Sequence, residues 1–143
     1  MSKQKIRFIE DMVKAKDICV LATSDGNTPH TSLMNYFADH AVMKFYFLSP
    51  KTSKKNKNLK KNPHVSILID RRDENIALSI NGVYSPIKKQ QTVDAIIKLF
   101  LLKSPHMKEF AEHPDTELIR IEGKSAELVQ GFTDVFSTKL INF

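Results

Sequence analysis

A run of hydroxyl and lysine side chains at the start of an expected helix is the part of this sequence best suited to chemistry. Residues 48–59 read Leu-Ser-Pro-Lys-Thr-Ser-Lys-Lys-Asn-Lys-Asn-Leu. Free backbone N–H groups and the positive end of the helix dipole favour an anion at such a helix start. The run is therefore suited to hold a phosphate group, although the chain has no Gly-x-x-x-x-Gly-Lys motif.

The same run also has a simpler interpretation, in which its lysines only form the solvated face of a helix. Thr52 or Ser53 would then serve as the N-cap of that helix. The lysines concerned are Lys51, Lys54, Lys55, Lys57, Lys60 and Lys61. The residues alone leave both interpretations open.

Length and composition indicate a single domain, residues 1–143, with a core of ordinary size. Hydrophobic residues make up 41% of the chain and charged residues 27%, as in globular proteins that do not cross a membrane. No apolar run approaches the ~20 residues that span a bilayer. The segment before the first helix is basic but lacks a secretory apolar stretch, so we expect a cytoplasmic protein. Cys19, the only cysteine, lies in an apolar run and is expected to be buried.

The net charge of +6 has two explanations. A basic surface can attract nucleic acid, and a small basic barrel of that kind is one hypothesis for this chain. The charge can also mark one concentrated anion site. Six of the 22 basic residues lie within residues 51–61, and no aromatic side chain that could stack on a base lies among them. The sequence therefore favours a local anion site over nucleic acid, and it shows no paired spacing of histidines that would indicate a metal site.

The elements that must position this site follow from periodicity and turn residues. The spacing predicts helices over residues 5–16, 52–61, 88–102 and 104–113. It predicts strands over residues 17–24, 30–37, 42–48, 65–69, 76–84 and 117–122, the last extended by residues 125–129. The first three strands are expected to form an antiparallel meander that begins with a turn at Asp25-Gly26. Gly82 is expected to be a bulge, and the apolar stripe of helix 88–102 is expected to face the core: Val93, Ile96, Ile97, Phe100 and Leu101.

This order of elements predicts a mainly β protein with peripheral helices, an α+β class. The strands come as a meander and not as alternating βαβ units, which argues against a Rossmann sheet. The apolar C-terminal tail could pack on a partner or cap its own barrel; it comprises Val135, Phe136, Leu140, Ile141 and Phe143.

Over residues 5–130 the chain resembles the FMN-binding split-barrel proteins that are similar to pyridoxamine 5′-phosphate oxidase. Three segments carry the resemblance. Residues 20–34 are similar to the opening hairpin of the family. Residues 45–59 correspond to its strand and basic helix, and residues 61–68 to its passage through Asn-Pro into the next strand.

The resemblance implies a six-stranded antiparallel split β-barrel that forms a homodimer, with FMN at the subunit interface. Relatives of this fold also bind the deazaflavin F420 or haem, so these cofactors are alternatives to FMN. The phosphate would lie at Ser53, Lys54 and Lys55, with Thr52 close by. The remaining cofactor-binding positions implied by the family are His30, Thr31, Ser32, Leu33, Met34, Asn35, Leu48 and Ser49.

Several positions depart from the family's oxidases. His30 stands where these enzymes often have arginine, Asn35 stands where they have lysine, and Ala77 replaces an amide side chain. The C-terminal Arg-x-His pair that holds the pyridoxal substrate is absent from the sequence. The resemblance therefore implies an FMN-dependent oxidoreductase other than an authentic pyridoxamine 5′-phosphate oxidase.

Such an enzyme would pass hydride or electrons between a reduced donor such as NAD(P)H and an unidentified small acceptor. A non-enzymatic flavin protein, acting in electron transfer or as a sensor, is the alternative. The sequence identifies no catalytic residue.

Overall fold

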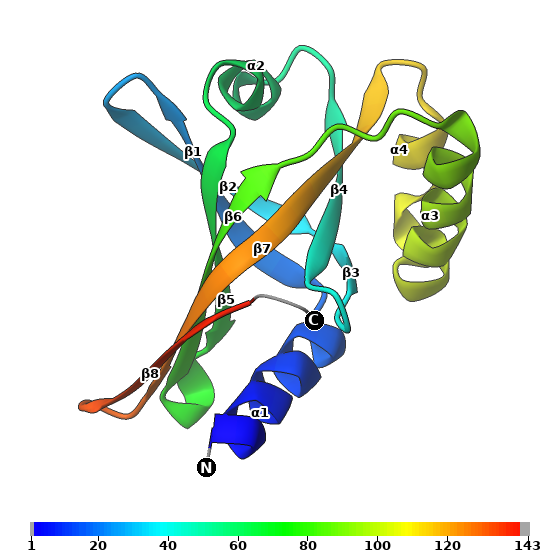
Figure 1. Ribbon diagram of the computed structural model, residues 1–143. Helices are drawn as coiled ribbons and strands as arrows, with labels where there is room; N and C mark the ends of the chain where they lie inside the picture. The colour runs from blue at the N-terminus through cyan, green and yellow to red at the C-terminus, as the bar shows by residue number, and fades with distance from the viewer. Residues whose placement is uncertain (1, 141–143) are drawn as a thin grey trace.

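The structure is a computed structural model that describes residues 2–140 (Figure 1). Its helices are α1 (Ser2–Ala15), α2 (Lys54–Lys61), α3 (Gln90–Lys103) and α4 (Lys108–Glu112), with short 3-10 turns at Arg72–Glu74 and Pro105–Met107. Its strands are β1 (Ile18–Asp25), β2 (Thr28–Asn35), β3 (Phe37–Asp39), β4 (Lys44–Pro50), β5 (His64–Arg71), β6 (Ile76–Tyr84), β7 (Thr116–Gln130) and β8 (Asp134–Lys139).

All strands belong to one curled antiparallel sheet, with the order β2-β1-β5-β6-β7-β4-β3 and with β8 paired to β7. The predicted class, a mainly β split barrel with peripheral helices, is confirmed. The sheet has eight strands where six were expected. The two additional strands are the three-residue β3 and the C-terminal β8, whose sequence lacks a strong strand signal.

Strand β7 joins the two halves of the barrel. It pairs with β4 from Thr116 to Glu122 and with β6 from Ile121 to Gln130. The predicted bulge at Gly82 is confirmed, because the register between β6 and β7 shifts between Asn81 and Gly82. A Cβ atom on Gly82 would lie 2.7 Å from the backbone oxygen of Glu122, so this close approach of the two strands requires glycine.

The predicted meander is only partly correct. Strands β1 and β2 form the expected hairpin, with Gly26 at a φ of +58° in the turn. Strand β4, however, pairs with β3 and β7 and not with β2. The chain leaves β2 at buried Tyr36, whose backbone N–H donates to the oxygen of Asp17 at 2.8 Å. That bond lies at the end of the β1–β2 ladder. The next three residues form β3, which lies at the opposite edge of the sheet.

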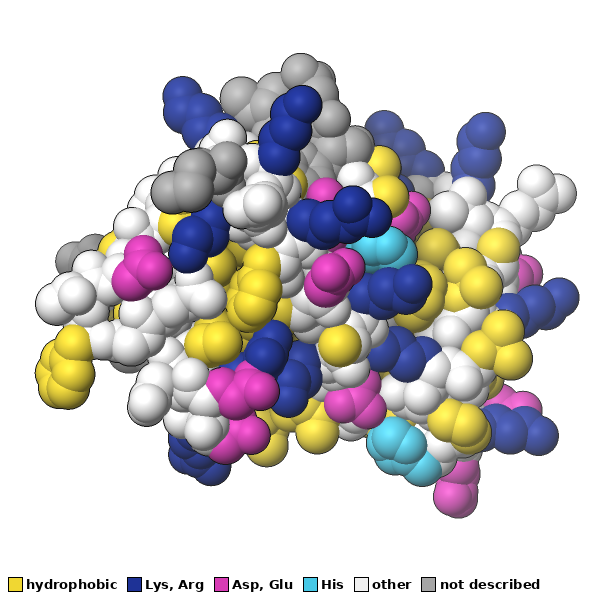
Figure 2. All heavy atoms as spheres, turned by 90° about the horizontal axis from the view of Figure 1, so that it is seen from below, with side chains coloured by type: hydrophobic (Ala, Val, Ile, Leu, Met, Phe, Trp, Pro, Cys, Tyr) yellow, Lys and Arg dark blue, Asp and Glu magenta, His cyan; other side chains and the backbone are white. Residues whose placement is uncertain are grey.

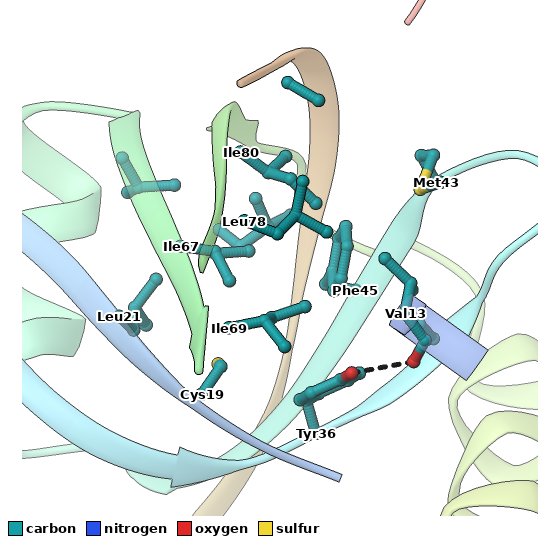
Figure 3. Close-up of a cluster of buried hydrophobic side chains, with 14 of the residues drawn as sticks. Val13, Cys19, Leu21, Tyr36, Met43, Phe45, Ile67, Ile69, Leu78 and Ile80 are labelled. Atoms are coloured by element: carbon teal, nitrogen blue, oxygen red, sulfur yellow. Dashed lines mark hydrogen bonds between the residues drawn. The ribbon is translucent and has the colours of Figure 1, made fainter. Parts of the chain in front are cut away.

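The hydrophobic core lies inside the curl of the sheet and below it, where α1 closes one end (Figure 3). Helix α1 contributes Ile9, Met12 and Val13, each at most 1% exposed. Cys19 is buried as expected, and burial raises the pKa of its thiol to about 12. Leu140 belongs to the same core, so this part of the C-terminal tail caps its own barrel, while Ile141 and Phe143 lie outside the described residues.

Helix α3 does not face the core in the way its apolar stripe predicted. Phe100 is fully buried, but the other four residues of the stripe are only partly buried. The helix lies to one side of the sheet in Figure 1, because strand side chains already fill the interior. Leu102 is 79% exposed, and hydrophobic side chains reach the surface on that side of the molecule in Figure 2. No helix within residues 2–140 is long and apolar enough to cross a membrane.

Tyr36→Phe should destabilise the protein by about 1–3 kcal/mol, which chemical denaturation can measure. The Tyr36 hydroxyl donates to the Val13 oxygen at 2.7 Å, and both groups are buried (Figure 3). Val13 lies in the last turn of α1, where helix carbonyls lack a partner within the helix. Without the hydroxyl this carbonyl stays buried and unsatisfied.

Tyr84→Phe is the matched control, because the Tyr84 hydroxyl is only half-buried and bonds no protein atom within residues 2–140. Equal losses in the two variants would contradict the role given to the Tyr36 hydroxyl.

Candidate functional site

The candidate site is centred on the start of α2, where a chain of hydroxyl and amide groups fixes the helix to the barrel. Ser53 is the N-cap, which decides between the two predicted capping residues. Its Oγ accepts the backbone N–H of Asn56 at 3.3 Å and donates to Asn56 Oδ1 at 2.9 Å. The fully buried Ser49, at the end of β4, lies with its Oγ 3.0 Å from the Ser53 Oγ.

Two asparagines form the buried side of α2, together with Leu59. Asn58 Nδ2 donates to the Oγ1 of Thr23 on β1 at 3.1 Å. Asn56 is 1% exposed, and its Nδ2 has no hydrogen-bond partner within residues 2–140. A buried amide without a partner is uncommon and indicates a place for a ligand acceptor. Neither asparagine was predicted as a site residue, although Asn56 precedes the apolar Leu59 by three residues and so lies on the same face of the helix.

The lysines of α2 differ in how their charge is balanced. Lys54 Nζ lies 2.8 Å from Asp25 Oδ2, and Lys60 Nζ lies 3.7 Å from Glu117 Oε2. Lys55 forms no ion pair with a carboxylate within residues 2–140. Its side chain is partly buried, and this burial lowers the pKa of its ammonium group. Of the two lysines predicted to hold a phosphate, Lys55 is therefore the one with an unbalanced charge.

The six predicted positions on β2 divide between the two faces of the sheet. His30, Ser32 and Met34 stand opposite Thr23, Leu21 and Cys19 of β1 and share their inner face. The Oγ of Ser32 lies 3.4 Å from Nε2 of His30. Since His30 pairs with the residue that binds Asn58, it lies next to the α2 anchor.

The other three β2 positions, Thr31, Leu33 and Asn35, share the outer face, because side chains alternate along a strand. A cofactor bound on one face of the sheet can therefore contact the side chains of only three of the six predicted β2 residues.

The side chains of Leu48 and Ser49, near the end of β4, likewise point to opposite sides of the strand. Ser49 belongs to the α2 anchor, whereas the buried Leu48 lines a cavity of about 470 Å³ on the side of α3. Thr52 is exposed and lines a different cavity of about 570 Å³ beside His106 and His113. The structure thus brings Ser49, Ser53 and the two lysines together and places Leu48 and Thr52 apart from them.

The groups at the start of α2 fit a phosphate. Lys55 supplies an unbalanced positive charge, and the Asn56 amide supplies an N–H donor without a partner. Backbone N–H groups in the first turn of a helix also favour an anion, although the N–H of Asn56 already donates to Ser53 Oγ. Lys54 is shared with Asp25, which reduces the charge it offers to an anion.

Lys54→Gln should raise the pKa of Asp25 toward its ordinary value, with Lys61 still lowering it, as measured by NMR titration of the Asp25 carboxyl carbon. In the folded protein this pKa lies below 3.8, first through the hydrogen bond from Lys54 and then through the charges of Lys54 and Lys61. The stability that the pair adds is therefore present above pH 3.8 and lost as the pH falls through the lowered pKa. Lys57→Gln is the control and should leave the Asp25 titration unchanged; an unchanged midpoint in Lys54→Gln would refute the ion pair.

Comparison with known proteins places the chain in a family. A family model described as pyridoxamine 5′-phosphate oxidase matches residues 7–130. A search among curated protein sequences gives no significant match.

Solved structures share the fold at low sequence identity. General stress protein 26 from Bacillus anthracis is 20% identical, with a TM-score of 0.73 over 94% of this chain and 98% of that one. A Clostridium acetobutylicum protein of the pyridoxinephosphate oxidase family is 14% identical, with a TM-score of 0.76 over 97% and 96% of the two chains. A haem-binding protein from Mycobacterium smegmatis is 17% identical, with a TM-score of 0.76 over 92% of this chain and 57% of that one.

The family model covers most of the chain, and the curled antiparallel sheet with its basic helix α2 agrees with the resemblance found in the sequence. The chain belongs to the pyridoxamine 5′-phosphate oxidase-like split-barrel family.

Proposed function

We propose that this protein binds FMN and acts as a flavin-dependent oxidoreductase on a small molecule, with a reduced donor such as NAD(P)H. The observation that carries this proposal is the start of α2, where Lys55 forms no ion pair and Asn56 Nδ2 makes no hydrogen bond within residues 2–140. Family membership supports the choice of a flavin as the ligand. Bound FMN would supply the hydride and electron transfer, and the protein would supply binding and orientation.

Each residue at this site has a defined part in the proposal. Lys55 holds the phosphate by charge, and the Asn56 Nδ2 donates to one of its oxygens. Ser53 keeps the helix start in place through its bonds to Asn56 and Ser49. His30, on the inner face of β2, lies where it can contact the same anion or the ribityl chain.

A homodimer is part of the proposal, with the cofactor at the subunit interface. Apolar side chains lie together on the outer face of β2, β1 and β5, where Leu33 stands opposite Val20 and Val20 stands opposite Leu68. Leu33 is 76% exposed and Leu68 is 41% exposed. An exposed apolar patch of this kind is typical of a protein interface, which supports a second copy covering it.

The substrate is proposed to differ from pyridoxamine phosphate. His30, Asn35 and Ala77 stand where the resemblance implies arginine, lysine and an amide.

Nucleic acid is not the ligand that we propose, because Lys and Arg side chains are interspersed with Asp and Glu on the face shown in Figure 2. The proposal also includes a cytoplasmic location. Cys19 is buried and forms no disulfide, which is compatible with that location.

Haem is the second candidate ligand. The similar structure from Mycobacterium smegmatis is a haem-binding protein. In this chain His106, His113 and Phe110 line the cavity of about 570 Å³ beside Thr52. The backbone N–H of Asp115 donates to Nδ1 of His113, which places the proton of the neutral ring on Nε2, so this bond would have to break before His113 could bind iron through Nε2.

Reconstitution followed by desalting and a visible absorption spectrum separates these candidates. We expect the spectrum of a retained flavin, its identity as FMN established by mass, and turnover of NAD(P)H with a generic acceptor. A flavin that is retained without turnover would indicate an electron-transfer or sensor protein. A Soret band after incubation with haem and no flavin, or retention of the deazaflavin F420 alone, would contradict FMN as the cofactor.

Lys55→Ala should weaken FMN binding by about tenfold to a hundredfold, because a hydrogen bond to a charged group contributes roughly 1.5–3 kcal/mol. Lys54→Ala should have a smaller effect, since Asp25 already shares that charge. Quenching of FMN fluorescence measures the affinity. Lys57→Ala, an exposed lysine of the same helix, is the control. Unchanged affinity in the Lys54→Ala, Lys55→Ala double variant would refute the phosphate site.

A further inference from the structure

A cavity of about 470 Å³ lies between α3 and the sheet, on the outer side of β4 and β7. Its walls include Leu48 and Leu118, which pair across β4 and β7, and Ile87, Val93 and Ile97 from the α3 side. It exists because α3 buries only Phe100, near its C-terminal end. The volume is in the range of small-molecule pockets, which are mostly apolar with a few polar groups.

The polar side chains that line this cavity differ in whether they already have a partner in the protein. Glu117 is paired with Lys60 at 3.7 Å, and Asp94 accepts the side-chain amide of Gln90 at 2.9 Å. Lys51 forms no ion pair within residues 2–140, and the Tyr84 hydroxyl bonds no protein atom there. Lys51 and the Tyr84 phenol are therefore the donors left to a ligand, and Asp94 keeps its negative charge because the Gln90 amide is neutral.

The phenol of Tyr84 is a hydrogen-bond donor at neutral pH. Partial burial raises the pKa of Tyr84, and the nearby charge of Glu117 raises it further. Lys51 also lines the cavity, and its backbone N–H donates to the oxygen of Asp115 at 2.8 Å. Two donors, one of them charged, thus stand beside the apolar side chains of a cavity whose lining is mixed in polarity.

We propose that this cavity binds a small hydrophobic carboxylate, with an aromatic or medium-chain body. The body occupies the space between Leu48, Leu118 and Ile97, and the carboxylate accepts from Lys51 and Tyr84. An amine would compete with Lys60 for Glu117 and would meet the charge of Asp94, whose partner Gln90 is neutral, so an amine of the same length is the decisive competitor in the test. A neutral molecule would gain nothing from the Lys51 charge.

The proposal is independent of the flavin. None of Ser53, Lys54 and Lys55 lines this cavity. Leu48 and Ser49 are neighbours on β4 but point to opposite sides, so the two sites share a strand and no side chain. Failure of FMN binding and failure of carboxylate binding can therefore be observed separately in the same preparation.

Calorimetric titration with three probes of equal chain length tests the proposal: octanoate, octanol and octylamine, at neutral pH and low salt. We expect octanoate to bind with the lowest Kd, by roughly tenfold, the value of one charge-assisted hydrogen bond. Octylamine binding as tightly as octanoate, or no binding of octanoate, would overturn the proposal.

Variants assign the binding to this cavity. Lys51→Gln and Tyr84→Phe should weaken octanoate several-fold and leave octanol unchanged, whereas the control Lys57→Gln should change neither. Ala111→Phe should fill the chamber and abolish binding of all three probes, with circular dichroism reporting that the variant is folded. Octanoate binding that is the same in Lys51→Gln and wild type would contradict the assignment. The octanoate Kd should not depend on added FMN.

Discussion

The structure depends on one shared strand, β7, which belongs to both halves of the barrel. Its first part pairs with β4, and its second part pairs with β6 and β8. The change of partner occurs where Gly82 approaches the Glu122 backbone too closely for any side chain. On the opposite strand, Gly123 donates to the Met43 oxygen at 2.8 Å. Because the sheet curls at this crossing, the end of β4 is brought near the β1–β2 hairpin although the two are not paired.

Helix α2 occupies the junction formed by that curl. It is bound on one side by Ser49 of β4, through Ser53, and on the other by Thr23 of β1, through Asn58. These are polar contacts, so a helix with a single buried leucine can still have a defined position. The position matters for chemistry, because a phosphate site requires its donors to be fixed before the ligand arrives. Lys55 and the Asn56 amide owe their placement to this anchoring and not to the helix alone.

The end of β4 serves two sites because neighbouring side chains on a strand point in opposite directions. Ser49 turns toward α2 and the proposed phosphate, and Leu48 turns toward the cavity beneath α3. Each site has one lysine without a carboxylate partner within residues 2–140, Lys55 in the first and Lys51 in the second. Both are therefore suited to anions, which agrees with the concentration of positive charge in residues 51–61. Residues 51–61 thus supply one lysine to each of the two sites.

The sequence by itself determined what depends on near neighbours along the chain. The periodicity of α1, the Asp25-Gly26 turn, a cap at Thr52 or Ser53 and the bulge at Gly82 were predictable, and three motifs in order indicated the family. Only the tertiary structure decided the pairing of β4 with β7, the ion pair between Lys54 and Asp25, which are 29 residues apart, and the burial of Asn56. The incomplete burial of the apolar stripe of α3 also depends on the tertiary structure. Local propensity is set by backbone geometry within a few residues, whereas these contacts depend on which distant segments the curled sheet brings together.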